Sequence, residues 1–471
     1  MIEQYELVVI GSGPAGEKAA VAAAYFGHTV ALVEEQELTG GVAVTHVGMI
    51  PTKTLREAAL YVTGFRKRDI YGVRVELDPA AVYAALRKRT TEVIETMAGQ
   101  VRQNLDRHRV ELVRGRARLA GDGIVVVQTR RGGERRLHGE GIILATGSRP
   151  FHPPGIPFDD RDVLDAEGVM EIESPPRSVV VVGGGAIGCE HASIFTALGS
   201  HVTLVDRGPR LLPYVDAELS VLLARLFADM GMEVRSNAAI DAVSRDDAGL
   251  VVRLDDGTEL RPDKLLVASG RSGNTETLDL DAAGVEVNQR GLVVVDGSFR
   301  TTAPGVYAAG DVIGAPALAS TAMEQGRVAA SAALGMGSRS DVDPSPPTGI
   351  YSIPEIASVG LTEEAAAALP GGHVVGRGRF ASNSRANISG ATEGMVKLVA
   401  ERGTGRLVGV HILGESATEA IHVGQAVVKH GDSVDYFIST TLNVPTLCEA
   451  YKYAAYDALQ RLNEAALSPA G

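Results

Sequence analysis

The sequence has few of the residues that define several protein classes. Its 471 residues include only two cysteines, Cys189 and Cys448, and no tryptophan. Two thiols cannot build a disulfide-rich secreted scaffold or a multi-cysteine zinc or iron–sulfur site. Aromatic residues make up 4% of the chain, which disfavours stacking platforms for bases or sugars.

Long apolar runs and an excess of positive charge are also missing. No apolar run approaches the roughly 20 residues of a membrane span. The N-terminus runs directly into a strand pattern and does not read as a signal peptide. The net charge is −13, from 45 basic and 58 acidic residues, which disfavours nucleic-acid binding. We therefore expect a soluble, cytoplasmic protein of about three domains, with no nucleic-acid or membrane partner.

Glycine is abundant, and its positions reveal an internal repeat. Residues 7–34 align with residues 179–206 at a constant offset of 172. Each copy reads as an apolar strand, a GxGxxG turn, an alanine-rich helix and a second strand that ends in an acid, Glu34 or Asp206. The aligned glycines are Gly11 with Gly183, Gly13 with Gly185, Gly16 with Gly188, and Gly27 with Gly199.

This pattern has a specific physical basis in nucleotide binding. The first glycine permits the tight turn, the second lets a pyrophosphate approach, and the third lets the helix pack on the sheet. Free N–H groups at the helix start attract phosphate, and the terminal acid accepts hydrogen bonds from a ribose diol. A single glycine-rich turn can be purely structural, but two copies with the same acid spacing favour two dinucleotide sites.

Three later segments read as apolar strands that are followed by a small residue and glycine. They are residues 143–149, 266–271 and 305–311, and the last ends in Asp311, whose carboxylate could hold a ligand hydroxyl. Taken singly, each is no more than a strand terminus. Their order along the chain is that of strands returning from a nucleotide-binding domain.

Further motifs identify a family. The chain contains Ile50-Pro51-Thr52-Lys53, Ala145-Thr146-Gly147, Gly310-Asp311, and Pro445-Thr446 with Glu449. Together with both repeats, these residues resemble the flavoprotein pyridine nucleotide–disulfide oxidoreductases, the group of lipoamide dehydrogenase and glutathione reductase, over nearly the whole chain. The resemblance implies an α/β fold with two Rossmann-like dinucleotide-binding domains, for FAD and for NAD(P), and a C-terminal α+β dimerisation domain.

The resemblance also implies domain boundaries and an assembly. Residues 1–152 and 276–345 correspond to the FAD-binding domain, residues 153–275 to the NAD(P)-binding domain, and residues 346–471 to the dimerisation domain. A homodimer or a higher homo-oligomer is expected through the last of these domains, with NAD(H) and NADP(H) as substrates.

The residues that would bind each nucleotide follow by position in the motifs. The expected FAD ligands are Gly11, Gly13, Pro14, Ala15, Gly16, Glu34, Gly41, Thr52, Lys53, Ala117, Thr146, Gly147, Arg271, Gly310, Asp311 and Ala319. The expected NAD(P) ligands are Gly183, Gly185, Ala186, Ile187, Gly188, Glu190, Asp206, Arg207, Arg210 and Gly270.

The departures from the family pattern bear on activity. The two positions of the family's redox-active cysteine pair are Val44 and Met49, in a loop over residues 40–44 with one extra residue, and the position of its catalytic histidine is Val444. None of these side chains can exchange thiols or shuttle protons. Cys189 and Cys448 are far apart in sequence and are expected to be buried free thiols. Disulfide reductase activity is therefore excluded.

Hydride transfer between nicotinamide and flavin remains open to this chain. In the family, the residues at Lys53 and Glu190 pair beside the reactive edge of the flavin and are the expected catalytic residues. Thr45-His46, residues 271–275 and residues 421–426 are similar to soluble, FAD-containing, Si-specific pyridine nucleotide transhydrogenases. This similarity implies a ping-pong transfer between NADPH and NAD⁺ through FAD at one nicotinamide site.

Two other functions stay open at this point. An NAD(P)H:quinone or dye oxidoreductase could use Val44, Met49 and Val444 as an apolar wall for a quinone ring. A catalytically silent flavoprotein could act as a nucleotide sensor. The nucleotide preference is also open, because Asp206 favours NAD whereas Arg207 and Arg210 could pair with the 2′-phosphate of NADP or could be ordinary surface arginines.

Overall fold

The protein folds into two compact units. The computed structural model describes residues 1–46, 48–64, 72, 78–337 and 341–467. The units are Met1–Leu55, Ala85–His152 and Ser269–Pro344 for the first, and Arg56–Ala84, Pro153–Ala268 and Ser345–Gly471 for the second. The division into three domains made from the sequence stays a prediction. Among the described helices, none is long and apolar enough to cross a membrane.

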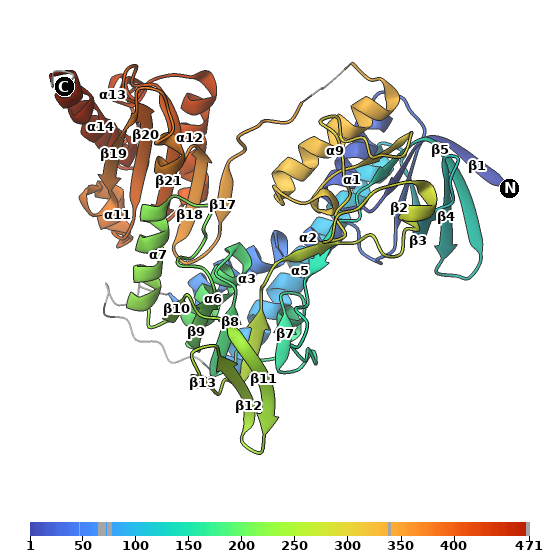
Figure 1. Ribbon diagram of the computed structural model, residues 1–471, viewed down its shortest axis with the longest axis horizontal. Coiled ribbons are helices and arrows are strands. Elements are labelled where there is room, and N and C mark those ends of the chain that lie inside the picture. The colour runs from blue at the N-terminus through green and yellow to red at the C-terminus, as the bar shows by residue number, and fades with distance from the viewer. Residues whose placement is uncertain (47, 65–71, 73–77, 338–340, 468–471) are drawn as a thin grey trace. The chain divides into compact units, whose positions relative to one another are not determined.

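The first unit is built on a parallel sheet with strand order β3-β2-β1-β5-β16 (Figure 1). Its central strands are nearly continuous apolar runs that are buried on both faces, as parallel strands usually are. Strand β4 pairs antiparallel with β3 and β5. The strands are β1 (Ile2–Ile10), β2 (Val30–Glu34), β3 (Glu111–Leu119), β4 (Ile124–Thr129), β5 (Glu134–Leu144), β6 (Ser148–Pro150), β15 (Arg271–Gly273) and β16 (Val306–Ala308).

Two helices of this unit pack closely because of one glycine. A Cβ on Gly326 of α9 would lie 2.1 Å from the carbonyl oxygen of Ala15 on α1, so only glycine allows this approach. Figure 1 shows the two helices side by side. The helices with residues in this unit are α1 (Pro14–Tyr25), α2 (Gly41–Thr45), α3 (Ile50–Thr63), α5 (Pro79–Arg107), α8 (Leu280–Ala283) and α9 (Ala319–Leu334), with the 3₁₀ turn η2 (Asp311–Ile313). The expected loop over residues 40–44 is corrected here, since α2 forms from Gly41 onward.

The second unit contains a parallel sheet with strand order β10-β9-β8-β14-β7 and a three-stranded antiparallel sheet. Helix α6 follows β8, and α7 follows β9. These elements are β7 (Val163–Asp165), η1 (Gly168–Glu171), β8 (Ser178–Val182), α6 (Ala186–Ala197), β9 (His201–Asp206), α7 (Ala217–Asp229), β10 (Glu233–Ser236), β11 (Ile240–Asp246), β12 (Gly249–Leu254), β13 (Glu259–Leu260) and β14 (Lys264–Val267).

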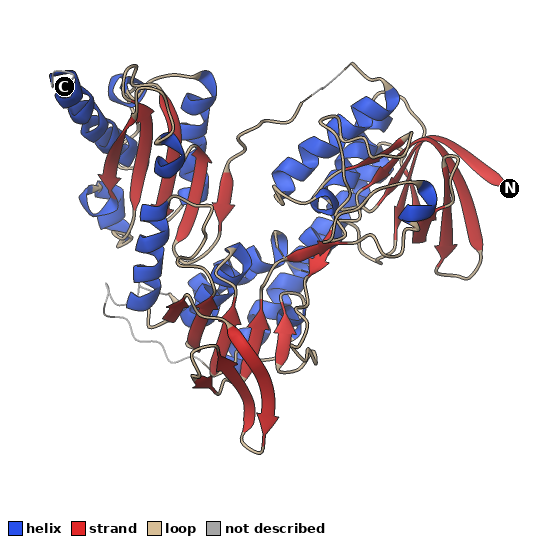
Figure 2. Ribbon diagram, viewed as in Figure 1, coloured by secondary structure: helices blue, strands red, loops and turns tan. Residues whose placement is uncertain are grey.

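The C-terminal part of the second unit is an antiparallel sheet with order β17-β18-β21-β20-β19. Helices α12 and α14 pack on it (Figure 2). Its elements are β17 (Thr348–Ile350), β18 (Glu355–Gly360), α10 (Glu363–Ala366), β19 (His373–Arg379), η3 (Phe380–Ser382), α11 (Ser384–Ser389), β20 (Met395–Glu401), β21 (Leu407–Gly414), α12 (Ala417–His430), α13 (Asp435–Ser439) and α14 (Glu449–Leu467). The predicted mixed α/β fold class is confirmed.

A charge cluster with a buried lysine at its centre joins α7 and α10 to the antiparallel sheet of this unit. We call Lys397, Asp216, Glu218, Glu363 and Arg377 the Lys397 cluster. The ammonium of Lys397 lies 2.8 Å from Asp216, 2.9 Å from Glu218 and 2.5 Å from Glu363. Asp216 also caps two helices, since its carboxylate accepts the backbone N–H groups of Glu218 on α7 and Glu363 on α10.

Glu218 gives this cluster a pH dependence. Burial alone would raise the pKa of its carboxyl, but hydrogen bonds from Arg377 and Lys397 outweigh burial and lower the pKa to about 2. A carboxylate with a depressed pKa stabilises the fold above its ordinary pKa of 4.5, and this stabilisation is lost as the pH falls toward 2.

We expect Glu218→Gln to lose stability at neutral pH and to show a flatter loss of stability between pH 4.5 and pH 2 than the parent protein. Thermal unfolding followed by circular dichroism over this pH range measures the effect. Glu259→Gln, at an exposed acid of β13, is the control and should parallel the parent. Parallel curves for Glu218→Gln and the parent would contradict the prediction.

Candidate functional site

The turn between β1 and α1 has the geometry of a dinucleotide-binding turn. Gly11 has a φ of 102°, and a Cβ on Gly16 would lie 1.9 Å from the carbonyl oxygen of Gly11. Gly13 is the N-cap of α1, has an extended backbone and would meet nothing within 4 Å if it carried a Cβ. The third glycine therefore closes the turn, whereas the space in front of the second is open.

The turn of the second repeat, between β8 and α6, has the same geometry. Gly183 has a φ of 111°, a Cβ on Gly188 would lie 1.8 Å from the Gly183 oxygen, and Gly185 faces open space as the N-cap of α6. In the first copy, the backbone N–H of Ser12 donates to Glu34 at 2.9 Å, and in the second that of Gly184 donates to Asp206 at 2.5 Å. The two turns are thus the same structure, each with an acid held at the glycine-rich loop.

Segments that are distant in sequence gather around the first turn. A Cβ on Gly41 would lie 2.9 Å from the Cα of Gly13. A Cβ on Gly310 would lie 3.1 Å from the Cβ of Ala15 on α1 and 3.5 Å from the Cβ of Ala322 on α9. The first turns of α1 and α9 and the Gly310 turn therefore converge.

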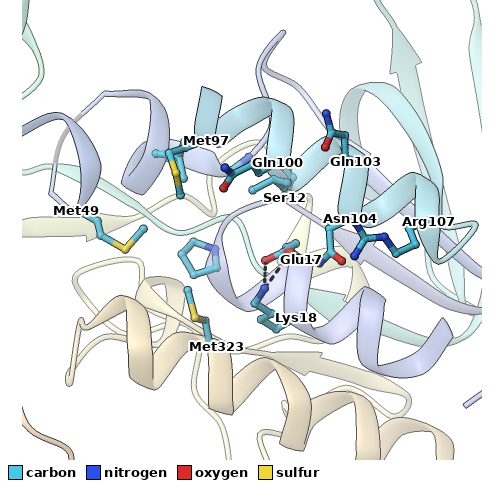
Figure 3. Close-up of a pocket in the computed structure, with 14 residues that line it drawn as sticks. Ser12, Glu17, Lys18, Met49, Met97, Gln100, Gln103, Asn104, Arg107 and Met323 are labelled. Carbon is cyan, nitrogen blue, oxygen red and sulfur yellow. Dashed lines mark hydrogen bonds and ion pairs between the residues drawn. The ribbon is translucent and has the colours of Figure 1, made fainter. Parts of the chain in front are cut away.

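A cavity of about 360 Å³ opens beside this turn (Figure 3). Its walls come from the glycine-rich turn, the segment after β2, helix α5 and helix α9. Val44 and Met49 line it, together with Met97 and Met323. The remaining lining residues are Ser12, Pro14, Glu17, Lys18, Gly40, Gln100, Val101, Gln103, Asn104 and Arg107.

The α5 wall was not predicted from the sequence. Met97, Gln100, Val101, Asn104 and Arg107 recur at helical spacing, so they occupy one face of α5. The carboxamide of Asn104 donates to Glu17 of α1 at 2.6 Å. The spacing alone could have identified the helix face, but no motif connects it to the glycine-rich turn.

The residues around this turn fit a bound FAD. Helix α1 has no side-chain cap, so its first N–H groups are available to a pyrophosphate. The hydroxyl of Thr321, in the first turn of α9, is buried without a hydrogen-bond partner. Such a group is expected where a bound ligand supplies the missing hydrogen bond. Thr321 was missed in the sequence, where Ala319 represented this helix start.

The two acids expected to hold FAD are both positioned by hydrogen bonds. Glu34 is buried and accepts from the hydroxyl of Ser12 at 2.5 Å and from the backbone N–H of Gln36 at 2.7 Å. Asp311 accepts from the hydroxyl of Ser148 at 3.0 Å, and Arg271 donates to that same hydroxyl at 2.7 Å. Arg271 therefore orients Asp311 through Ser148.

The other predicted FAD residues lie in the first unit as well. The hydroxyl of Thr146 donates to the carbonyl of Asn274 at 2.7 Å, and Gly147 has a φ of 70°. Ala117 is buried in the core on β3. Gly270, predicted for NAD(P), also falls in the first unit, where its carbonyl accepts the N–H of Phe151. Ligand binding by these residues stays a prediction.

The two expected catalytic residues are each held by backbone groups. The ammonium of Lys53 donates to the carbonyl of Gly48 at 2.6 Å, and the hydroxyl of Thr52 donates to the same carbonyl at 3.3 Å. Glu190 is buried on α6 and accepts the N–H of Tyr351 at 2.9 Å. Lys53 belongs to the first unit and Glu190 to the second, so their pairing stays a prediction.

Arg56 contacts the segment that holds Glu190, and this contact was not predicted from the sequence. Its guanidinium donates to the carbonyl of Ser352 at 3.1 Å and lies 3.1 Å from Glu355, and both side chains of this ion pair are largely buried. Ser352 directly follows Tyr351, whose N–H contacts Glu190. Arg56 thus stabilises the connection between β17 and β18, whose Tyr351 contacts Glu190.

The residues at the departures from the family pattern are also placed. Val44 is buried, Met49 is half-buried and both line the cavity, whereas Val444 is exposed. Both cysteines are free. Burial raises the pKa of the Cys189 thiol. Cys448 is only half-buried, at the edge of the C-terminal core, which corrects the expectation that both thiols are buried.

Comparison with curated proteins finds relatives along the whole chain. The chain is 42% identical over 462 residues to a protein of Mycobacterium tuberculosis named soluble pyridine nucleotide transhydrogenase, with 98% of each chain covered. It is 40% identical to a protein of the same name from Hahella chejuensis and 39% identical to one from Pseudomonas putida, with 98% of this chain and 99% of each relative covered.

Solved structures and family models agree with this result. The fold matches the HOCl-induced flavoprotein disulfide reductase RclA of Escherichia coli with a TM-score of 0.87 and 28% identity, over 97% of this chain and 99% of that one. It matches LpdA of Mycobacterium tuberculosis with a TM-score of 0.87, 27% identity and the same coverage. Residues 5–326 match the pyridine nucleotide-disulphide oxidoreductase model and residues 346–455 match its dimerisation domain. The chain therefore belongs to the pyridine nucleotide-disulphide oxidoreductase family.

Proposed function

We propose that this protein is a flavin-dependent NAD(P)⁺ transhydrogenase that works as a homodimer or higher homo-oligomer. The observation that carries the proposal is the pair of equivalent dinucleotide turns in a chain whose cavity beside the first turn is lined by Val44 and Met49. Hydride transfer needs one site for FAD and one for the nicotinamide nucleotide, and the two turns provide them. Val44 and Met49 offer no thiol that could receive the electrons. The relatives that match 98% of this chain carry the transhydrogenase name.

Each group of residues has a role in this proposal. The first turn, with Glu34 and Asp311, holds FAD, and the second turn, with Asp206, holds NAD(H) and NADP(H) alternately. FAD supplies two-electron chemistry, which lets one nicotinamide site serve a donor and then an acceptor. Val44 and Met49 give the cavity an apolar wall, Lys53 offers a positive charge, and Glu190 orients the nicotinamide.

A quinone or dye reductase remains the second candidate. The cavity wall that contains Val44, Met49, Met97 and Met323 is apolar and would suit a quinone ring. The two functions share the reduction of the flavin by NAD(P)H and differ in the acceptor. The third reading, a silent nucleotide sensor, differs from both because NAD(P)H would then leave the flavin oxidised.

We expect that NADPH bleaches the flavin of the anaerobic holoenzyme stoichiometrically and that thio-NAD⁺, added after removal of NADP⁺, restores it as the thionicotinamide is reduced. Absorbance of the flavin and of the analogue, followed together, measures both half-reactions. Recovery only with a quinone or oxygen would replace the transhydrogenase by the reductase. No bleaching by NADPH or NADH, in a protein whose flavin is reduced by dithionite, would support the sensor.

A further inference from the structure

The segment after β9 folds back against the second glycine-rich turn. The carboxylate of Asp206 accepts the N–H of Gly208 at 2.7 Å, and the N–H of Leu212 donates to the carbonyl of Gly184 at 2.8 Å. Both ends of the segment are therefore fixed to the predicted nucleotide site. Arg207 and Arg210 lie on this fixed segment, so both begin close to the acid that would hold the ribose.

The two arginines differ in what their side chains contact. Arg207 is exposed and forms no ion pair or side-chain hydrogen bond with the residues that the structure describes. Arg210 is half-buried: one guanidinium nitrogen donates to Glu364 at 2.9 Å, and the other donates to the carbonyl of Pro213 at 2.9 Å. In this structure Arg207 is open to a ligand, whereas Arg210 is held.

Glu364 is a well-anchored partner for Arg210. It lies on α10, in the part of the chain that matches the dimerisation domain, 154 residues away in sequence. The same carboxylate oxygen that contacts Arg210 also accepts the N–H of Ala217 at 2.9 Å, at the start of α7. Burial would raise the pKa of this carboxyl, but the bonds from Arg210 and from backbone amides lower it to about 2, so the group is ionised near neutral pH.

We propose that Glu364 restrains Arg210 and thereby weakens binding of the 2′-phosphate of NADP(H), which brings the affinities for NADP(H) and NAD(H) closer together. This inference rests on the proposed function, since it assumes that the second repeat binds both nucleotides. Near the ribose, the charges of Asp206 and Glu364 offset those of Arg207 and Arg210. Removal of the Glu364 charge leaves one net positive charge and an arginine fork that is free to pair with a phosphate dianion.

The test compares two fragments that differ in one phosphate. Titration calorimetry of the holoenzyme with 2′,5′-ADP and with 5′-AMP gives a Kd for each without any turnover. We expect Glu364→Gln to lower the Kd for 2′,5′-ADP by about threefold to fivefold and to change that for 5′-AMP by less than about twofold. Glutamine suits the test because its amide oxygen can still accept the N–H of Ala217 at the start of α7, whereas the ion pair that restrains Arg210 is lost.

Two further variants test whether the gain in affinity for 2′,5′-ADP comes from Arg210. Glu364→Gln combined with Arg210→Gln should lose the gain, because the proposal requires that the gain comes from the released arginine. Asp229→Asn removes a carboxylate that pairs with Arg225 at 3.9 Å on α7, and it should leave both Kd values unchanged.

The outcomes separate this inference from the proposed function. If the parent protein binds neither fragment, the second repeat is not the nucleotide site and the proposed function fails with it. If the parent binds both fragments and Glu364→Gln leaves the ratio of the two Kd values unchanged, only the inference is overturned. A gain that persists in the double variant also overturns it, since Arg210 would not then be the group that Glu364 restrains.

Discussion

We expect the Gly185→Val variant to lose reduction of its flavin by NADPH and NADH by on the order of 100-fold in kcat/KM, while it keeps its FAD and its folded stability. Gly185 has φ −79° and ψ −176°, an extended backbone that valine also adopts. A Cβ at this position would meet nothing within 4 Å. The side chain would occupy only the space in front of the N-terminus of α6, where a pyrophosphate must approach.

The neighbouring glycines provide the contrast. A Cβ on Gly188 would lie 1.8 Å from the carbonyl oxygen of Gly183, so Gly188→Ala should distort the turn and lower the melting temperature as well. Gly13→Val is the mirror variant, because Gly13 also faces open space, and it should lower FAD content instead of nucleotide affinity. The position within a repeat therefore decides whether folding or binding is lost, and the choice of repeat decides whether FAD binding or hydride transfer is lost.

Three measurements decide the result: the FAD-to-protein ratio, the melting temperature, and the anaerobic rate of flavin bleaching by each nicotinamide nucleotide. Reduction of the Gly185→Val flavin by dithionite serves as the control that the cofactor is intact. Bleaching by NAD(P)H within about threefold of the parent rate would show that the second repeat is not the nucleotide site, since a valine there would block little else.

The sequence predicted the parts of the site that local backbone geometry determines. The GxGxxG turns need glycine because a Cβ on the third glycine would lie 1.8–1.9 Å from the carbonyl oxygen of the first. The spacing of these glycines alone therefore specified both turns and the acids that they hold. Gly41 and Gly310 were also identified as site residues, and the structure places each against the first turn. In these cases a short-range steric requirement leaves a direct trace in the sequence.

The parts that depend on long-range packing were not predictable. In the sequence, the residues of α5 that line the cavity have the pattern of an ordinary amphipathic helix face. Thr321 is recognised as a candidate ligand-binding residue only because its hydroxyl is buried without a hydrogen-bond partner. The partner of Arg210 lies 154 residues along the chain, and no local pattern indicates it. Lys397 lies on β20 between Val396 and Leu398, where a lysine suggests solvent exposure rather than a buried ion pair.

Replacement of that lysine should have the second large effect. We expect Lys397→Met to destabilise the second unit by about 3–5 kcal/mol, the usual cost of leaving a buried charge without its partner. The side chain of Lys397 is 1% exposed and that of Asp216 is fully buried. Methionine fills the volume of the lysine stem but leaves the carboxylates of Asp216, Glu218 and Glu363 together without the central ammonium.

Hydrogen exchange tests this prediction because it reports the protection of backbone amides region by region. This suits a protein of two units that need not unfold together. Amides of α7 and β20 should lose protection, because Asp216 caps α7 and Lys397 lies on β20. Lys264→Met is the matched control: Lys264 pairs with Asp162 at 2.7 Å but is 25% exposed, and its loss should cost at most about 1 kcal/mol.

A second substitution tests the electrostatic cause. In Lys397→Met with Asp216→Asn, asparagine keeps an oxygen that can accept the N–H of Glu218 but carries no charge, so the double variant should be more stable than the sum of the single losses predicts. Strict additivity of the two losses would mean that lost packing, and not an uncompensated carboxylate, explains the effect of Lys397→Met. Since Glu363 of the same cluster is adjacent to Glu364, loss of the cluster should also loosen the carboxylate that holds Arg210.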